Sequence, residues 1–323
     1  MDINGSKVLL IGGAGLVGSH LADQLIDEDV EEIIIFDNFV RGTRQNLAQA
    51  NQSPKVTIIE GSITDREHLR EVMTGVDVVF LLSALWLGEC LHEPRACVDV
   101  NIVGNFNVIE LAHELGIKKI VYSSSASVYG DALQVPMTEE HPFNNRTMYG
   151  ASKIAIEQIL RAFNDMHGLN YVGYRYMNIY GPRMDYKGTY VGVIPKVLDR
   201  LDQGLPPLIF GDGSQSYDFI YVGDVARANI LGAKSEATDE FFNIGIGVRT
   251  TIAELVELIL ELTESDLEPK YLPQEKMFVT HRVGSTEKAE KLLGFRAQVP
   301  LREGLAKFIE WRQRDKAILS AVR

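Results

Sequence analysis

Cysteine is scarce in this sequence: only Cys90 and Cys97 occur among its 323 residues. Two cysteines are too few for the disulfide framework that supports small secreted proteins, and they suit a reducing compartment. We therefore expect both to pack as separate buried thiols. No metal site is predicted.

Basic residues and long apolar runs are scarce as well. Lysine and arginine number 32 against 44 aspartates and glutamates, which gives a net charge of -12 and a pI near 5.1. This acidity argues against a nucleic-acid or anionic-membrane partner. No apolar run approaches the roughly 20 residues of a spanning helix, and the start of the chain lacks the basic segment of a signal peptide. We expect no membrane contact and a soluble protein in the cytoplasm.

A glycine-rich turn follows the first predicted strand. Residues Lys7–Ile11 are apolar without alternation, as in a parallel strand that is buried on both faces. They lead into Gly12-Gly-Ala-Gly-Leu-Val-Gly18 and then into a helix predicted from Leu16 to Glu28. The glycines permit a tight turn, and the free amides of the helix N-terminus would face a pyrophosphate.

The second predicted strand supports a dinucleotide site. It covers Glu32–Phe36 and ends at Asp37, where a carboxylate would bind the hydroxyls of the adenosine ribose. Because that carboxylate disfavours a 2′-phosphate, the pattern predicts NAD rather than NADP. Arg41 and Arg44 follow in the loop and leave NADP as the alternative.

Strands and helices go on alternating through the first half of the chain. This order predicts right-handed βαβ units and a parallel sheet with helices on both faces. Ligands in such sheets bind at the carboxyl ends of the strands, which predicts one cleft for the residues at those ends. Those residues are Gly12, Asp37, Ser62, Ser83 and Ser125. The later elements are strands predicted at Val56–Glu60, Asp77–Leu82 and Lys118–Tyr122, and helices at Asp65–Met73 and Glu93–Leu115.

Tyr149 and Lys153 open a long helical pattern that continues to His167. One turn separates them, so the ammonium can lie beneath the phenol. A tyrosine has a pKa near 10, and bringing it to about 7 requires roughly 4 kcal/mol of stabilisation of the phenolate. An adjacent lysine, together with an oxidised nicotinamide, would supply it in a partly dry cleft. The pair therefore predicts proton transfer at a carbinol oxygen.

With these motifs together, the chain resembles the extended short-chain dehydrogenase/reductases, in the NAD-dependent nucleotide-sugar epimerase/dehydratase branch that includes UDP-glucose 4-epimerase-like proteins. The resemblance covers nearly the whole chain. It is carried by the glycine-rich turn, Asp37-Asn38, Gly61-Ser-Ile63, Asn101, Ser123-Ser-Ser-Ala-Ser-Val-Tyr-Gly130, Tyr149-Gly-Ala-Ser-Lys153, Arg175-Tyr-Met-Asn-Ile-Tyr-Gly-Pro-Arg183, Gly211-Asp-Gly-Ser-Gln215, Asp218-Phe-Ile-Tyr-Val222 and Phe242-Asn-Ile-Gly245.

The resemblance implies a set of site residues. Catalysis would rest on Ser125, Tyr149 and Lys153. Bound NAD would contact Gly12, Gly15, Leu16, Val17, Gly18, Asp37, Asn38, Arg41, Gly42, Ser62, Ile63, Leu82, Ser83, Ala84, Asn101, Tyr149, Lys153 and Tyr176. A nucleotide-diphosphate sugar would contact Trp86, Ser125, Asn178, Arg183, Val193, Ile209, Tyr217 and Arg282.

The residues after the serines favour one reaction within the branch. Nucleotide-sugar 4,6-dehydratases carry an Asp-Glu pair there, and UDP-glucuronate decarboxylases keep the glutamate. This chain has Ala126-Ser127. The resemblance therefore implies a 4-epimerase that forms a transient 4-keto sugar, with a decarboxylase or other oxidoreductase as the alternative. A catalytically silent NAD-binding regulator is the second alternative.

The fold implied is a Rossmann-type doubly wound parallel sheet with a smaller C-terminal substrate-binding α/β lobe. We assign residues 1–177 and about 216–246 to the NAD-binding domain, and 178–215 and 247–323 to the lobe. The segments Asp218–Val222 and Phe241–Ile244 are expected to return to the large sheet. By resemblance the protein is a homodimer that pairs helices near Val98–Leu115 and Met148–Met166 as a four-helix bundle.

Three positions in the second half depart from the family. Tyr217 stands where many relatives have an arginine that grips a phosphate, and Glu275 stands near the place of another. Arg282 occupies a position that resembles the gate for a sugar N-acetyl group. Three roles remain open for Arg282: a replacement phosphate ligand, a partner of a sugar carboxylate, or a surface residue.

Overall fold

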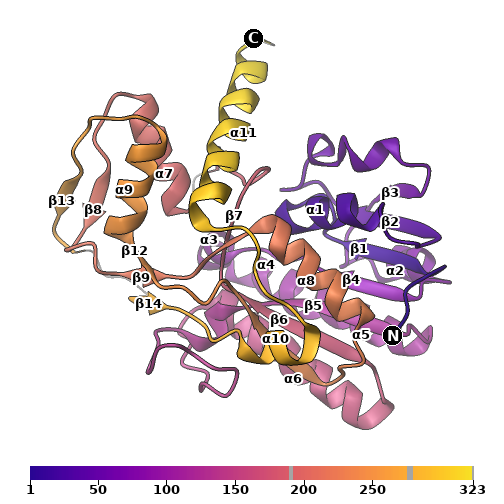
Figure 1. The fold of residues 1–323 in the computed structure, drawn as a ribbon. Helices are drawn as coiled ribbons and strands as arrows, with labels where there is room; N and C mark the ends of the chain where they lie inside the picture. Colours follow the sequence, from indigo (N-terminus) through magenta and orange to yellow (C-terminus); the bar gives the residue numbers. More distant parts are fainter. Residues whose placement is uncertain (189–191, 275–278, 322–323) are drawn as a thin grey trace.

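A parallel sheet of seven strands, covered by helices on both faces, makes up the larger part of the molecule (Figure 1). The computed structural model describes residues 1–188, 192–274 and 279–321. The strand order is β11-β6-β5-β4-β1-β2-β3. The strands are β1 (Lys7–Ile11), β2 (Glu32–Asp37), β3 (Val56–Glu60), β4 (Val78–Leu81), β5 (Lys119–Ser125), β6 (Tyr171–Tyr176) and β11 (Glu240–Ile244). This confirms the predicted doubly wound sheet.

The order of the strands reverses between β1 and β4. From β1 the chain adds β2 and β3 on one side, and from β4 it adds β5 and β6 on the other. At such a switch point the connections leave in opposite directions and open a crevice at the carboxyl ends of the strands. Gly12 and Ser83 follow the two central strands directly, so the crevice opens beside them.

Except for the edge strand β3, the strands are buried on both faces, which explains the apolar runs in the sequence. In β1, Val8 and Leu10 belong to one apolar cluster and Leu9 and Ile11 to another. The first cluster is closed by α1 (Leu16–Leu25), α8 (Val222–Lys234) and α10 (Glu287–Leu293). The second is closed by α2 (Arg66–Met73), α5 (Asn105–Glu114) and α6 (Met148–His167).

Two predicted helices differ from the structure. The first ends at Leu25 rather than Glu28. The helix predicted over Glu93–Leu115 is divided into α4 (Pro94–Val98), a π-helical segment (Asp99–Gly104) and α5, and a further short helix, α3 (Leu87–His92), precedes it. A π-helical segment inserts extra backbone into a helix and turns the side chains that follow it, which an apolar period of 3.6 does not reveal.

The expectation of two separate thiols is wrong. Cys90 and Cys97 form a disulfide between α3 and α4, with their Cα atoms 4.9 Å apart. The chain bends between the two helices at Glu93, so that residues seven apart in sequence face one another. The cysteines therefore give no support to a reducing compartment.

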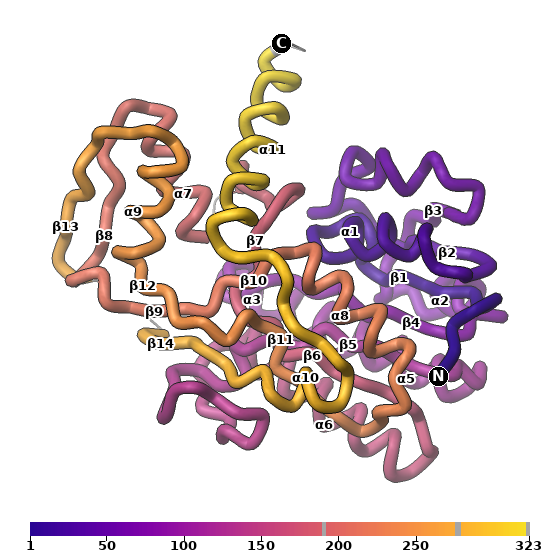
Figure 2. The backbone as a smooth tube through the Cα atoms, in the orientation of Figure 1, coloured from indigo at the N-terminus to yellow at the C-terminus, as the bar shows by residue number. Residues whose placement is uncertain are grey.

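A smaller lobe packs around a third apolar cluster. The tube in Figure 2 shows the chain leaving the sheet side after β7 and building this lobe before it returns through β10 and α8. The lobe and its connections contain β7 (Asn178–Tyr180), α7 (Val193–Asp202), β8 (Leu208–Phe210), β9 (Ser216–Tyr217), β10 (Phe219–Tyr221), β12 (Thr250–Thr251), α9 (Ile252–Leu262), β13 (Lys270–Leu272), β14 (His281–Arg282) and α11 (Leu301–Ala321).

One of the two segments expected to return to the large sheet does so. β11 pairs with β6 at the sheet edge. β10 pairs instead with β7 in a separate two-stranded sheet, so the prediction for Asp218–Val222 is wrong. Short apolar strands look alike in sequence, and their partners are decided by where the chain crosses between the two parts.

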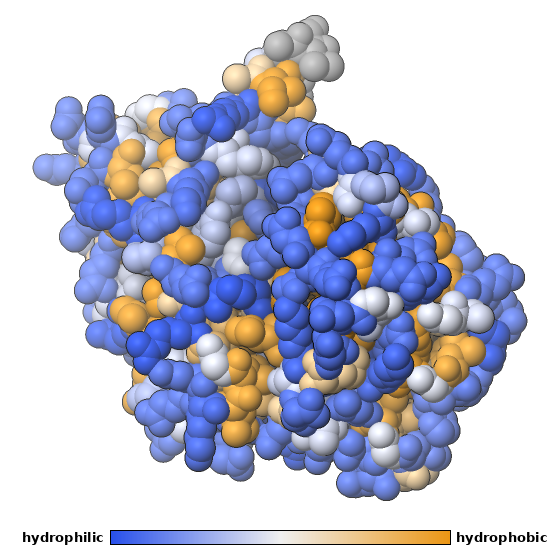
Figure 3. All heavy atoms as spheres, turned by 45° about the vertical axis from the view of Figure 1, so that its right-hand side comes forward, coloured by the Kyte–Doolittle hydropathy of each residue, from blue (hydrophilic) through white to orange (hydrophobic). Residues whose placement is uncertain are grey.

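The face of the molecule in Figure 3 is mostly hydrophilic, with small apolar patches scattered over it. Among the described residues, none of the helices combines the length and the apolar character needed to cross a membrane.

His20 makes the stability of the fold sensitive to acid. Burial, reinforced by the charge of Arg183, lowers the pKa of His20 to about 4, and its Nε2 lies 3.0 Å from the Pro182 carbonyl oxygen. An unfolded histidine titrates near 6.5, so stability is lost as the pH falls from about 6.5 through 4, by about 3–4 kcal/mol in total.

We expect His20→Gln to remove this loss while keeping a donor for the Pro182 carbonyl. Denaturant unfolding of both proteins between pH 7 and pH 4.5 measures it. An equally steep loss of unfolding free energy in the variant would assign the acid sensitivity to other groups.

Candidate active site

Tyr149 and Lys153 lie in the first two turns of helix α6. The Thr147 hydroxyl caps its start by accepting a hydrogen bond from the Gly150 N–H at 3.0 Å, and Gly168, in the left-handed conformation at φ 69°, ends it. These caps fix where the helix begins. Tyr149 and Lys153 therefore lie one turn apart on the side that faces the end of β5.

The Tyr149 phenol lies close enough to Ser125, the last residue of β5, for the Ser125 hydroxyl to act on its pKa. The Ser125 oxygen also accepts the Ser127 N–H at 3.1 Å, which fixes the direction of its hydroxyl. A carbinol oxygen placed between these two hydroxyls would exchange its proton with one and be held by the other. The structure thus joins a strand end and a helix start that are 24 positions apart in the sequence.

Lys153 is buried beneath this pair. Its Nζ donates to the Ser123 carbonyl oxygen at 2.6 Å and lies 5.0 Å from the ring centroid of Tyr122 and 5.8 Å from that of Tyr149. Burial lowers the pKa of Lys153 to about 7, although the charge of Glu157 opposes the shift. The amine therefore titrates near neutral pH.

The pKa of Tyr149 is shifted in the opposite direction. Burial raises its pKa, and the hydrogen bond from Ser125 and the charges of Arg41 and Arg282 counteract only part of the effect. Lys153, which was expected to lower it, is not among the groups that do so, because its own pKa of about 7 leaves the amine neutral where the phenol ionises. The protein's own groups therefore favour the neutral phenol.

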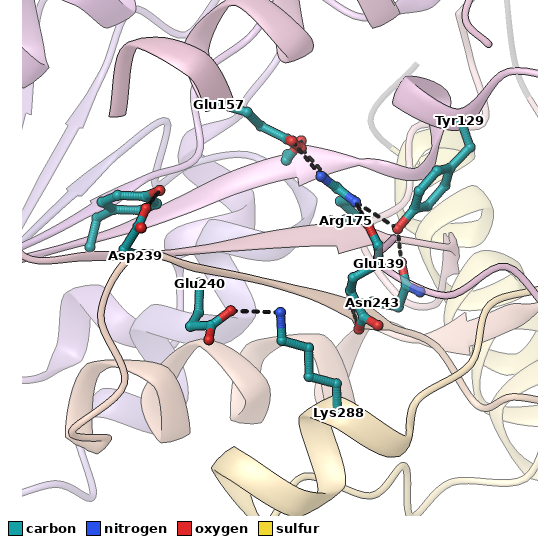
Figure 4. A network of polar contacts seen from close by, with 10 residues as sticks. Tyr129, Glu139, Glu157, Arg175, Asp239, Glu240, Asn243 and Lys288 are labelled. Carbon is teal, nitrogen blue, oxygen red and sulfur yellow. Dashed lines mark hydrogen bonds and ion pairs between the residues drawn. The ribbon is translucent and has the colours of Figure 1, made fainter. Parts of the chain in front are cut away.

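A buried ion pair lies directly behind this site (Figure 4). Glu157, one turn after Lys153, accepts two hydrogen bonds from Arg175 of β6, at 3.0 and 2.7 Å, and one from the Ser124 hydroxyl at 2.6 Å. Arg175 also donates to the Tyr129 hydroxyl at 3.0 Å. Both charges are almost completely shielded from water. The network fastens α6 to β5 and β6.

A cleft of about 600 Å³ opens at the switch point of the sheet. All residues predicted to contact NAD except Asn101 line it: Gly12, Gly15, Leu16, Val17, Gly18, Asp37, Asn38, Arg41, Gly42, Ser62, Ile63, Leu82, Ser83, Ala84, Tyr149, Lys153 and Tyr176. The structure brings these residues together. That they bind the cofactor stays a prediction.

The cleft fits a dinucleotide at its glycine turn and at Asp37. Gly12 has φ +82°, and a Cβ there would lie 2.8 Å from the Ser83 backbone nitrogen. No side chain caps the start of α1, so its first amides remain directed at the cleft. The Asp37 carboxylate is held by the N–H groups of Ala14 and Phe39, at 2.9 and 2.8 Å, and lines the cleft. These are the features that hold a pyrophosphate and a ribose.

Asn101 lies behind the cleft and does not line it. Its side-chain oxygen accepts the Leu85 N–H at 2.7 Å, and its nitrogen donates to the Leu85 carbonyl oxygen at 2.8 Å and to Ser152 at 3.2 Å. These bonds hold the loop that carries Trp86. The expected contact of Asn101 with the dinucleotide stays a prediction.

A second cleft, of about 640 Å³, lies in the smaller lobe. Of the predicted substrate residues it includes Asn178, Val193 and Tyr217. Ile209 is buried in the lobe's core, while its neighbours Leu208 and Phe210 line the cleft, and its contact with substrate stays a prediction. Side chains alternate along β8, and a shift of one residue exchanges the two faces.

The other predicted substrate residues lie elsewhere. Trp86 lines the dinucleotide cleft under the Arg41 guanidinium, 4.4 Å from its ring centroid. Arg183 also borders that cleft and pairs with Asp23 at 2.6 Å. Arg282 lines neither cleft but is close enough to Tyr149 and Tyr217 to act on their charges. Glu275 lies outside the described residues.

Sequence reasoning missed the roles of Glu157, Arg175 and Arg41. A carboxylate four residues after Lys153 on the same helical face was a usable signal for the first. Arg175 stood inside a quoted motif without a role. Nothing local marks Arg41 as a charge that acts on Tyr149, because the two meet only through the fold.

Comparison with known proteins gives a family match over most of the chain. A model described as the NAD dependent epimerase/dehydratase family matches residues 8–245. A UDP-glucose 4-epimerase of Mycolicibacterium smegmatis is 31% identical over 94% of this chain and 98% of its own length. A UDP-N-acetyl-alpha-D-glucosaminuronate decarboxylase of Bacillus cytotoxicus is 31% identical over 94% of this chain and 97% of its own.

The same likeness holds among solved structures. A UDP-N-acetylglucosamine 4-epimerase from Methanobrevibacter ruminantium M1, in complex with UDP-N-acetylmuramic acid, superposes with a TM-score of 0.91. It is 34% identical, and the match covers 97% of this chain and 99% of that one.

The ion pair behind the site is testable by a double-mutant cycle. Removing one partner of a buried pair leaves an uncompensated charge, so Arg175→Met and Glu157→Gln should each lower the free energy of unfolding by about 3–5 kcal/mol. The combined variant should lose clearly less than the sum of the two losses. Urea unfolding measures all four proteins.

Arg302 provides the matched control because its pair with Glu261 is exposed. Arg302→Met should cost less than about 1 kcal/mol. Additive losses in the Glu157–Arg175 cycle would show that the two side chains are not coupled.

Proposed function

Since the chain belongs to the NAD-dependent epimerase/dehydratase family, we propose that it is a nucleotide-sugar 4-epimerase. The observation that carries the proposal is the meeting of Tyr149 and Lys153 at a cleft built for a dinucleotide, with the Ser125 hydroxyl close enough to act on the phenol. The substrate class is a nucleotide-diphosphate sugar, as in the names of the similar proteins.

NAD is the cofactor of this family, and the residues of the larger cleft suit it. We assign the pyrophosphate to the glycine turn and the start of α1, and the adenosine ribose to Asp37. The reacting end then lies toward Tyr149 and Lys153. When bound, NAD supplies a positively charged hydride acceptor that is regenerated in each cycle.

The chain's own residues carry out the proton transfers. Tyr149 takes the proton from the sugar 4-hydroxyl as hydride leaves C4, and Ser125 holds the same oxygen in its hydroxyl and keto forms. The pKa of Lys153 is near 7, so its amine gains and loses a proton at neutral pH. Tyr149 must change between phenol and phenolate at the same pH. The 4-keto sugar rotates in the site, and hydride returns to its opposite face.

The missing carboxylates favour epimerisation. Ala126 and Ser127 are both buried after β5, and neither supplies the acid or base that eliminates water from a sugar. The decarboxylase alternative draws support from the Bacillus cytotoxicus relative. Against it stands Ser127 in place of the glutamate that those enzymes keep. A silent NAD-binding regulator would not require Tyr149, Ser125 and Lys153 to meet.

Tyr149→Phe should lower kcat by about 10²–10⁴-fold, because the proton of the 4-hydroxyl loses its acceptor. Bound NAD, released by denaturation and measured by absorbance, should remain at the wild-type level. Proton NMR of UDP-glucose, UDP-N-acetylglucosamine and UDP-glucuronate incubated with the protein measures formation of the C4 diastereomer.

Tyr271→Phe is the control, since that tyrosine is exposed on β13. It should leave turnover unchanged. Wild-type activity in Tyr149→Phe would remove the phenol from the chemistry, and release of carbon dioxide or accumulation of NADH would favour the decarboxylase or oxidoreductase alternative.

We also propose a cytoplasmic homodimer that pairs α5 and α6 with their copies. Support comes from exposed apolar side chains along this side of the molecule, which include Leu91, Val103, Met148 and Met166. The two helices already pack against each other, with the rings of Phe106 and Phe163 in edge contact. Exposed apolar residues that gather on one side are typical of an interface.

Val103→Arg should convert the dimer to a monomer, because it would bury two guanidinium groups at the twofold interface without partners. Ile318→Arg, at an equally exposed apolar position on α11, is the matched control. Sedimentation velocity at micromolar concentration measures both. A wild-type protein that sediments as a monomer, or an unchanged dimer in Val103→Arg, would contradict the proposed interface.

A further inference from the structure

Arg282 is the last residue of β14, which pairs in parallel with β9 and places it opposite Tyr217. Its Nε is buried and has no hydrogen-bond partner among the described residues. The acidic group whose charge reaches it is Asp131. That carboxylate is on an exposed residue and is already held by the Thr280 N–H at 2.8 Å.

Three other arginines with little exposed side chain have carboxylate partners. Arg175 pairs with Glu157, and Arg312 pairs with Asp199 and Asp202. Arg183 pairs with Asp23. A guanidinium that is removed from water without such a partner costs free energy. We therefore expect the acidic partner of Arg282 to belong to a bound ligand.

The position of Arg282 indicates which part of a ligand it meets. Its charge acts on Tyr149, which receives the reacting carbinol, and on Tyr217, which lines the second cleft. It therefore lies within reach of a residue of each cleft, the reacting Tyr149 in one and Tyr217 in the other. Lys196 and Arg200 already line the second cleft itself and supply positive charge to a bound nucleotide there.

We propose that Arg282 binds a carboxylate on the sugar of the substrate, so that the chain acts on a nucleotide-diphosphate sugar acid in preference to a neutral hexose. This rests on the proposed 4-epimerase function. A guanidinium offers a planar fork that matches a carboxylate with two parallel hydrogen bonds, and neither a hydroxymethyl nor an N-acetyl group accepts both. The buried Nε is satisfied when the acid is bound.

The test compares UDP-glucuronate with UDP-glucose, which differ only at C6. The wild-type protein should show a kcat/KM for UDP-glucuronate about 100-fold above that for UDP-glucose. Because loss of the Arg282 charge acts on Tyr149 with either sugar, Arg282→Met should lower the first value by about 100-fold more than the second. Arg282→Lys keeps the charge without the fork and should fall between them. Arg302→Met, at an exposed arginine, should change neither value.

Calorimetric binding keeps the inference separate from the proposed function. Titration of UDP-glucuronate and of UDP-glucose into the NAD-loaded protein measures the same preference without turnover, and it is also the readout if neither sugar is epimerised. Tighter binding of UDP-glucuronate that Arg282→Met abolishes supports the site even then. Equal affinities for both sugars, or equal losses for both in Arg282→Met, would overturn it.

Discussion

The buried pair of Glu157 and Arg175 is the interaction on which the site depends. It ties α6 to β6, the strand next to the sheet edge at β11, and the Ser124 hydroxyl ties the same carboxylate to β5. Tyr149, Lys153 and Glu157 follow one another at intervals of four along a single helical face. Glu157, at one end of this row, is held by Arg175, and Tyr149, at the other end, lines the cleft. Rigid placement of the phenol follows from that attachment, because loops do not hold a reacting group so closely.

Burial brings the pKa values of the two titrating groups of the site closer together. It raises the pKa of the Tyr149 phenol and lowers that of the Lys153 ammonium to about 7, since both neutral forms are favoured away from water. Ser125, Arg41 and Arg282 then restrain the rise at Tyr149. A positive charge brought in by the cofactor acts on the same phenol at short range. The chemistry is thereby tied to occupation of the dinucleotide cleft.

Much of this arrangement was readable from the sequence, and the exceptions have a common cause. Strand ends at Gly12, Asp37 and Ser125 and the helix at Tyr149 follow from local patterns, and the sheet topology then brings them together. The pairing of Cys90 with Cys97, the partner of β10 and the inward direction of Ile209 depend on backbone bends and strand register. Those are decided by contacts between distant segments, which one sequence does not display.

The two parts of the molecule place different demands on their residues. The reacting groups stand on β5 and on the packed face of α6, so their positions tolerate little change. The groups that we propose to meet the sugar stand on β9 and β14, strands of two residues at the junction with the lobe. Residues 217 and 282 thus lie on other elements than Tyr149 and Lys153, although the charge of Arg282 still acts on the pKa of Tyr149. Reaction type and substrate choice are therefore carried by separable elements of one chain.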